Sequence, residues 1–225
     1  NLELVVLMAA FATLKIPFVG IDHTLDSAEI ARCVDRLGAD CVVFTRSHET
    51  KVARAIVSSG NSRLAICLDG CSDAFSFEQL VDRRDVSRVN FDSLPARAFE
   101  SLSFTSGTSG TPKITRRTAS FDARRFAYLT NRFGFGDQDV FLVTLPFYHV
   151  STTGWARMFM GHGATIVLGD LNDPDVLAGQ LTGHGITACL VVPPILARLV
   201  SVAEARHVEH SLRFLIVGGK HFPVG

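Results

Sequence analysis

Residues 103–113 read SFTSGTSGTPK, a run of hydroxyl side chains and two glycines that ends at Lys113. Leu102–Phe104 reads as the end of a strand that delivers the chain into this run. Glycine lets the backbone approach a ligand closely and adopt positive φ. Consecutive N–H groups and hydroxyls form a concavity for anions, and lysine adds a point charge. The stretch therefore predicts a polyphosphate-binding loop, although a flexible Ser/Gly linker has a similar composition.

The order of residues within the loop separates these interpretations. Pro112 stands where a Walker loop requires glycine before the lysine, so this is not that motif. The order TSGTSGTPK at 105–113 instead resembles the phosphate-loop signature of the adenylate-forming superfamily. That superfamily includes acyl-CoA synthetases, luciferases and the adenylation domains of peptide synthetases. The resemblance favours the phosphate loop over the linker.

Three other segments resemble the same superfamily in the same order. LPFYH at 145–149 is similar to its second core motif, a strand end followed by an aromatic residue and a histidine. LIVGG at 215–219 is similar to the strand and glycine pair that precede the adenine site. Residues 7–22 are similar to its helix followed by G-x-x-x-V-P-L-D-P. The resemblance thus covers nearly the whole chain.

Helical and strand patterns alternate along the sequence, which predicts an α/β fold of repeated β-α units with parallel, doubly wound sheets. Ser27 is the expected N-cap of the second helix and Gly38 its C-terminal residue. Helices are expected at 4–14, 27–37, 48–58, 120–132, 152–160, 175–182 and 194–202. Strands are expected at 18–21, 41–44, 64–68, 102–104, 140–145, 164–168, 188–192 and 212–217. We expect two partial subdomains, 1–98 and 99–225, the second carrying the loop 103–113 and lacking its C-terminal end.

Composition excludes several classes of partner. The 225 residues carry 22 basic and 22 acidic side chains, so no basic excess favours nucleic acid. The apolar stretch Leu4–Leu14 is too short to span a bilayer. Five cysteines without a CxxC pair favour a reducing compartment, and we expect a cytoplasmic protein. Because the chain opens on Asn1 and stops after a glycine pair, we expect it to be part of a longer protein.

The resemblance implies an acid–thiol ligase. Such an enzyme activates a carboxylic acid with ATP and Mg²⁺ as an acyl-adenylate, then forms a thioester with CoA or with carrier-protein phosphopantetheine. The implied catalytic residues are Lys113 and His149, and no metal ligand is expected from the protein. The implied ATP-binding residues are Thr105, Ser106, Gly107, Thr108, Ser109, Gly110, Thr111, Lys113, Gly218 and Gly219. The 225 residues alone are expected to be inactive in the overall reaction.

Peptide-synthetase adenylation domains usually carry an aspartate around 146–149, which here reads PFYH. A fatty or aryl acid is therefore the expected substrate. Two alternatives stay open: an adenylation module for an atypical acid, and a nucleotide- or acyl-adenylate-binding protein without catalysis. The oligomeric state is also open.

Several side chains fit two interpretations. His149 fits either a position beside the acyl-adenylate or a buried, hydrogen-bonded core histidine. Trp155 fits the substrate pocket or the core. The arginines at 116, 117, 124 and 125 fit a salt-bridged surface or a site near phosphates.

Overall fold

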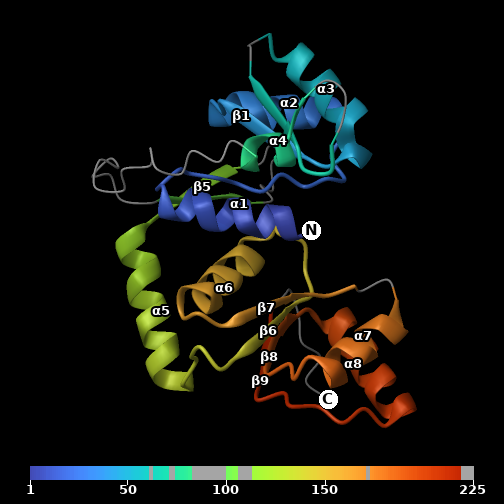
Figure 1. The fold of residues 1–225 in the computed structure, drawn as a ribbon. Helices are drawn as coiled ribbons and strands as arrows, with labels where there is room; N and C mark the ends of the chain where they lie inside the picture. The colour runs from blue at the N-terminus through green and yellow to red at the C-terminus, as the bar shows by residue number, and fades with distance from the viewer. Residues whose placement is uncertain (61–62, 71–73, 83–99, 106–112, 171–172, 219–225) are drawn as a thin grey trace. The chain divides into compact units, whose positions relative to one another are not determined.

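The computed structural model describes residues 1–60, 63–70, 74–82, 100–105, 113–170 and 173–218 (Figure 1). It divides into two compact units, Asn1–Ala119 and Ser120–Gly225. Each unit contains a parallel sheet with helices, so the predicted α/β class is confirmed. Along the sequence the boundary between the units follows Ala119, whereas the expected boundary between subdomains follows residue 98. None of the described helices is long and apolar enough to cross a bilayer.

The first unit is built around a three-stranded parallel sheet in the order β1-β2-β3, with Cys41 opposite Leu64. Its core joins Ile30 and Val34 of one helix to Ala55 of another and Val42 of the first strand. The elements are α1 (Leu2–Thr13), α2 (Ser27–Leu37), β1 (Cys41–Phe44), η1 (Arg46–His48), α3 (Glu49–Ser58), β2 (Leu64–Cys67), β3 (Phe75–Ser76) and α4 (Phe77–Val81).

Two local predictions in this unit are wrong. Residues 18–21 form no strand. Ser27 is the first residue of α2, and its N-cap is Asp26. The Asp26 carboxylate accepts a hydrogen bond from the Glu29 N–H at 2.8 Å, and the Glu29 carboxylate accepts one from the Asp26 N–H at 2.9 Å. This reciprocal capping box satisfies two N–H groups that a helix start leaves unpaired. Gly38 ends the helix at φ 60°, as expected.

The phosphate-loop sequence lies between two paired strands. β4 (Glu100–Thr105) and β5 (Lys113–Thr118) form an antiparallel hairpin. The sequence predicts the first strand but not the second, because KITRRT carries one large apolar residue and so lacks a strand's apolar pattern. The hairpin belongs to the first unit.

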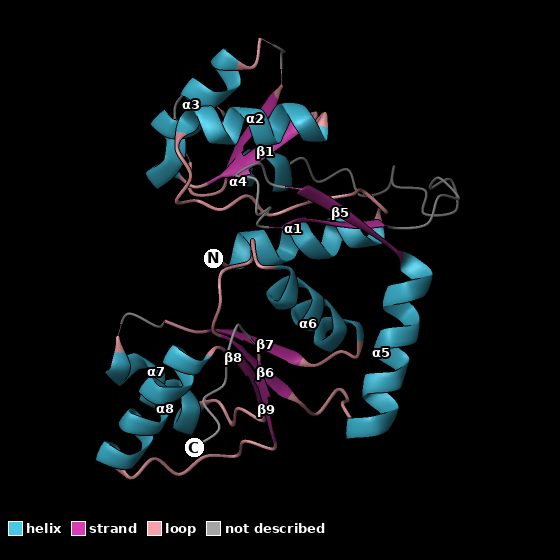
Figure 2. Cartoon of the chain, turned by 180° about the vertical axis from the view of Figure 1, so that it is seen from behind, coloured by secondary structure: helices cyan, strands magenta, loops and turns pink. Residues whose placement is uncertain are grey.

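The second unit contains a four-stranded parallel sheet in the order β7-β6-β8-β9 (Figure 2). After β6 the chain crosses to β7 on one side, then returns to place β8 on the other side of β6. The elements are α5 (Ala119–Phe133), β6 (Val140–Val143), α6 (Val150–Gly161), β7 (Thr165–Leu168), α7 (Pro174–Gly183), β8 (Ala188–Val191), α8 (Pro193–Arg206) and β9 (Phe214–Val217).

Both faces of this sheet are covered by apolar side chains. On one face Phe141 and Leu190 pack with Phe159 of α6. On the other, Leu142 and Cys189 pack with residues of α7 and α8, namely Leu177, Leu181 and Leu199. Coverage of both faces explains why these strands are continuous apolar runs in the sequence.

Candidate functional site

The ends of the predicted phosphate loop are held together by the hairpin. Thr105, the last residue of β4, pairs with Lys113, the first residue of β5. Paired residues of antiparallel strands lie about 5 Å apart, so the two ends of the loop adjoin. The Lys113 side chain is exposed at this end of the hairpin. Residues 106–112, which include the predicted Ser106, Gly107, Thr108, Ser109, Gly110 and Thr111, lie outside the described residues.

His149 lies at the N-cap position of α6, directly after the connection from β6. Its N–H donates to the Pro146 carbonyl at 3.1 Å, and its own carbonyl accepts from the Thr153 N–H at 3.2 Å. Its side chain makes no capping hydrogen bond in the described part of the chain. The imidazole is exposed and lies against the Tyr148 ring, with 4.3 Å between ring centroids. The buried-histidine interpretation is therefore wrong.

Gly218 follows β9 in the same sheet. Its N–H donates to the Val191 carbonyl of β8 at 3.0 Å, which continues the ladder beyond the last strand residue. Gly219 lies outside the described residues. Because the strands are parallel, Gly218 and His149 both lie at the carboxyl edge of the sheet.

The strand order identifies the most favourable point of that edge. The connections from β6 and β8 run in opposite directions, so the order reverses between these two strands. Open parallel sheets bind ligands at the carboxyl ends of the strands at such a reversal. The structure thus brings His149 and Gly218 to one sheet edge, while Thr105 and Lys113 form a pair in the other unit.

Trp155 packs against the core of the second unit. It packs edge-on against Phe135 with 5.9 Å between centroids, and is half-buried. The Arg125 guanidinium lies 5.7 Å from the Trp155 ring and 5.9 Å from the Phe126 ring, within range of a cation–π contact. These contacts support the core interpretation of Trp155.

The other arginines of the predicted cluster differ in exposure. Arg116 and Arg124 are exposed, whereas Arg117 is half-buried. The Arg117 Nε is buried and makes no hydrogen bond to the described residues.

A polar residue that the motif comparison missed directly follows β6. Thr144 is 2% exposed, and its hydroxyl donates to the Leu190 carbonyl of β8. The sequence signal was a single hydroxyl inside the apolar run VFLVTL at 140–145. This residue joins the two strands between which the order reverses.

Known proteins resemble the chain throughout its length. A profile of the AMP-binding enzyme family matches residues 1–225. A 2-succinylbenzoate–CoA ligase of Bacillus pumilus is 32% identical over 125 residues, covering 55% of this chain and 25% of that protein. A medium/long-chain-fatty-acid–CoA ligase of Mycobacterium marinum is 28% identical over 140 residues, covering 61% of this chain and 25% of that protein.

Solved structures share the fold. The o-succinylbenzoate CoA synthetase of Bacillus subtilis superposes with a TM-score of 0.70 at 20% identity, covering 98% of this chain and 54% of that one. A red-emitting luciferase of Phrixothrix hirtus gives a TM-score of 0.79 at 15% identity, covering 99% of this chain and 45% of that one. The chain spans about half the length of these structures. From the match along residues 1–225, the chain belongs to the AMP-binding enzyme family.

Proposed function

We propose that this chain is part of an ATP-dependent ligase that activates a carboxylic acid as an acyl-adenylate and transfers the acyl group to the thiol of CoA. The observation that carries the proposal is the family match along residues 1–225. Curated relatives that match are named CoA ligases. The position of Lys113 at the end of a hairpin supports the same function.

In the first step a carboxylate oxygen attacks the α-phosphorus of ATP, and the bond to the bridging oxygen of the β-phosphate breaks. Pyrophosphate leaves with both electrons of that bond. Negative charge therefore grows on the leaving group, and fixed positive charge lowers the barrier. Lys113 and the hydroxyls and N–H groups of residues 105–111 are the groups we assign to the β- and γ-phosphates.

In the second step the thiol sulfur attacks the acyl carbon, loses its proton, and AMP leaves. We assign His149 to a position beside the acyl-adenylate, and Gly218 and Gly219 to the border of the adenine and acyl groups. The exposure of His149 at the carboxyl edge of the sheet supports this role. A glycine at 218 admits close approach of a ligand to the backbone.

Magnesium would enter this site with the triphosphate. The described residues contain no group of three or more His, Cys, Asp or Glu that could hold a metal ion. Mg²⁺ is commonly bound by substrate phosphates and water with one or two carboxylates, and it would neutralise phosphate charge. We propose that Mg²⁺ arrives bound to the triphosphate.

The substrate we propose is a fatty or aryl acid without a required α-amino group. Residues 146–149 offer no carboxylate to hold an amino group. The names of matched relatives include 2-succinylbenzoate, phenylacetyl and medium/long-chain fatty acyl ligases. We place this reaction in the cytoplasm, with CoA preferred to a carrier protein as the acceptor.

The test is pyrophosphate exchange by the full-length protein with a panel of fatty, aryl and amino acids, followed by mass spectrometry for acyl-CoA. Exchange with fatty or aryl acids and formation of acyl-CoA are expected. Turnover confined to amino acids would refute the substrate class. ATP binding without exchange on any acid would point to a nucleotide-binding protein without catalysis.

A further inference from the structure

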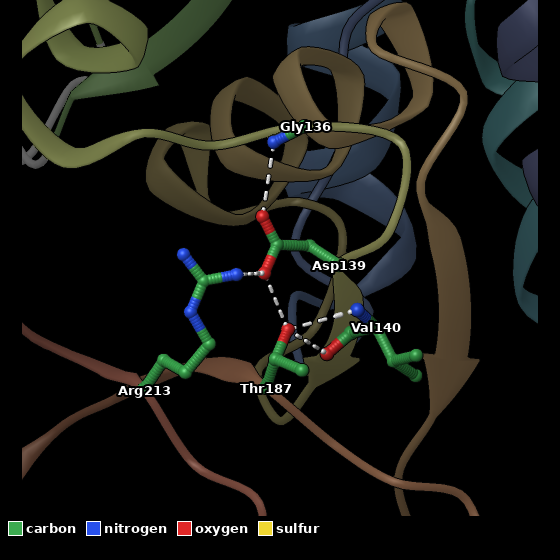
Figure 3. A network of polar contacts seen from close by, with 5 residues as sticks. All are labelled: Gly136, Asp139, Val140, Thr187 and Arg213. Atoms are coloured by element: carbon green, nitrogen blue, oxygen red, sulfur yellow. Dashed lines mark hydrogen bonds and ion pairs between the residues drawn. The ribbon is translucent and has the colours of Figure 1, made fainter.

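A threonine side chain joins β6 to β8 at each end of this strand pair. At the carboxyl end, the Thr144 hydroxyl donates to the Leu190 carbonyl. At the amino end, the Thr187 hydroxyl accepts from the Val140 N–H at 2.9 Å and donates to the Asp139 carboxylate at 2.6 Å (Figure 3). Thr144 directly follows β6 and Thr187 directly precedes β8, so the two threonines lie at opposite edges of the sheet.

Asp139 extends the amino-edge contact to a third strand. It is 1% exposed, and its second carboxylate oxygen accepts from the Gly136 N–H at 3.0 Å. The Arg213 guanidinium, just before β9, lies 3.2 Å from the oxygen that Thr187 also contacts (Figure 3). The starts of β6, β8 and β9 are therefore bound to one carboxylate.

These bonds bear on the register of β6 and β8, that is, on which residues of the two strands lie opposite each other. The β6–β8 ladder pairs Phe141 with Ala188 and Val143 with Leu190, and is only three pairs long. A slip of one residue moves every side chain to the opposite face of a sheet. In a sheet with one buried face, that slip is prevented because it would expose the apolar side chains. Here both faces are apolar, so the slip would still bury apolar side chains.

The chain path adds no strong constraint on this pair. The segment from β6 to β8 first forms α6, β7 and α7, so no tight turn fixes their alignment. The Thr187–Asp139 bond joins two side chains, so it forms in one alignment of β6 and β8, whereas main-chain groups recur along every strand. At the other end of the pair, the Thr144 hydroxyl adds a bond to the Leu190 carbonyl.

We propose that Thr144 and the Thr187–Asp139 pair are positioning residues that fix the β6–β8 register and thereby hold His149 in place relative to Gly218. His149 follows β6, whereas Gly218 follows β9, which pairs with β8. Each residue of slip would displace them by about 3.3 Å along the strands. The role of His149 and Gly218 in catalysis rests on the proposed function. The control of register by Thr144 and the Thr187–Asp139 pair does not.

The test compares Thr144→Val, which removes the hydroxyl at nearly constant shape, with Thr144→Ser, which keeps it, in the full-length protein. Thr182→Val is the control, because among the described residues that hydroxyl bonds to carbonyls of its own helix, the nearer at 3.1 Å. Hydrogen exchange of the β6 and β8 peptides should rise in Thr144→Val and stay at the wild-type level in Thr144→Ser and Thr182→Val. Thr187→Val should raise exchange in the same peptides from the opposite edge.

Kinetic measurements distinguish a positioning role in catalysis from a purely structural role in the sheet. Thr144→Val should lower kcat of adenylation by about tenfold or more while the KM for ATP changes little, and Thr144→Ser should restore kcat. Unchanged exchange in both valine variants would overturn the register assignment. Raised exchange with unchanged kcat would overturn the positioning role. If the wild-type protein activates no acid, the proposed function fails, and the exchange data still decide the register assignment.

Discussion

Lys113 is the last residue of the predicted phosphate loop, and its side chain carries a positive charge. Its replacement by alanine should slow adenylation by at least about thirtyfold, because a lost charge-assisted hydrogen bond costs about 2 kcal/mol. Pyrophosphate exchange by the full-length enzyme measures this effect. Arg54→Ala, which removes an exposed charge from α3, is the control and should leave exchange unchanged. Wild-type exchange in Lys113→Ala would contradict the assignment.

Cys189 is a structural thiol. It is 0% exposed within the second unit's core, and burial raises its pKa to about 12. At pH 8 only about one such thiol in ten thousand is the reactive thiolate. Iodoacetamide applied to the native protein should label half-buried Cys41 before Cys189, and leave Cys189 unlabelled until the protein unfolds. Mass spectrometry of the peptides checks this order, and equal labelling rates would contradict it.

His48 should make the first unit less stable in acid. Burial lowers its pKa, the positive charges of His23 and Lys51 lower it further, and Asp69 opposes them. The unfolded chain, with the ordinary value of 6.5, therefore binds more protons than the folded one. The free energy of unfolding should fall as pH drops through this value.

His48→Asn should weaken this pH dependence while keeping a partner for the hydroxyls of Thr45 and Ser47, which lie 3.0 and 2.9 Å from the His48 Nδ1. Urea unfolding at pH 8 and pH 5.5 measures the difference between the variants. Identical pH dependence in the two proteins would show that another group is responsible.

At the scale of elements, the start of α2 offers a direct test of helix capping. Asp26→Ala should lower the free energy of unfolding by about 1 kcal/mol, because it removes the acceptor for the Glu29 N–H. Ser27→Ala is the matched control, since Ser27 is the first helical residue and not the cap. Urea denaturation of both variants measures the effect. If Ser27→Ala lowered the free energy of unfolding more than Asp26→Ala, Ser27 would be the N-cap, as the sequence predicted.

Most elements were predictable because their signals are local. α2 follows from apolar periodicity and a terminal glycine, and β1 and β8 follow from continuous apolar runs; all three were expected within a residue or so of their observed ends. β5 was not predictable, because its pairing with β4 is set by a partner across the loop and not by its own composition. The expected strand at 18–21 failed for the reverse reason: a short apolar run without a partner strand forms no ladder.

For the candidate site, the sequence singled out residues whose placement the structure then describes. The motif order identified Lys113, His149 and Gly218, and the sheet topology explains why the last two share an edge. Their roles remain proposals. Thr144 and Asp139 were not identified, since their importance depends on which strands become neighbours, and that is a property of the assembled sheet.

At the scale of the whole molecule, the 225-residue chain should yield no thioester by itself. It spans 25% of the Bacillus pumilus ligase and 54% of the solved Bacillus subtilis synthetase. Because these relatives are much longer than the part that aligns, we expect the groups that exclude water from the reaction to lie partly outside these 225 residues.

The measurement is incubation of the purified chain with ATP, Mg²⁺, CoA and a mixed acid panel, followed by mass spectrometry. The full-length protein under the same conditions is the positive control. Catalytic amounts of acyl-CoA from the 225 residues alone would contradict the expectation.

The threonine bonds at the two ends of β6 and β8 also bear on how such sequences diverge. Where polar bonds at the strand ends hold the alignment, the apolar residues between them need only fill space. Leu142, Cys189 and their neighbours are then free to exchange with other apolar side chains of similar volume over many generations. A lineage could then renew the interior of this sheet while the distance between the segments that carry His149 and Gly218 stays the same.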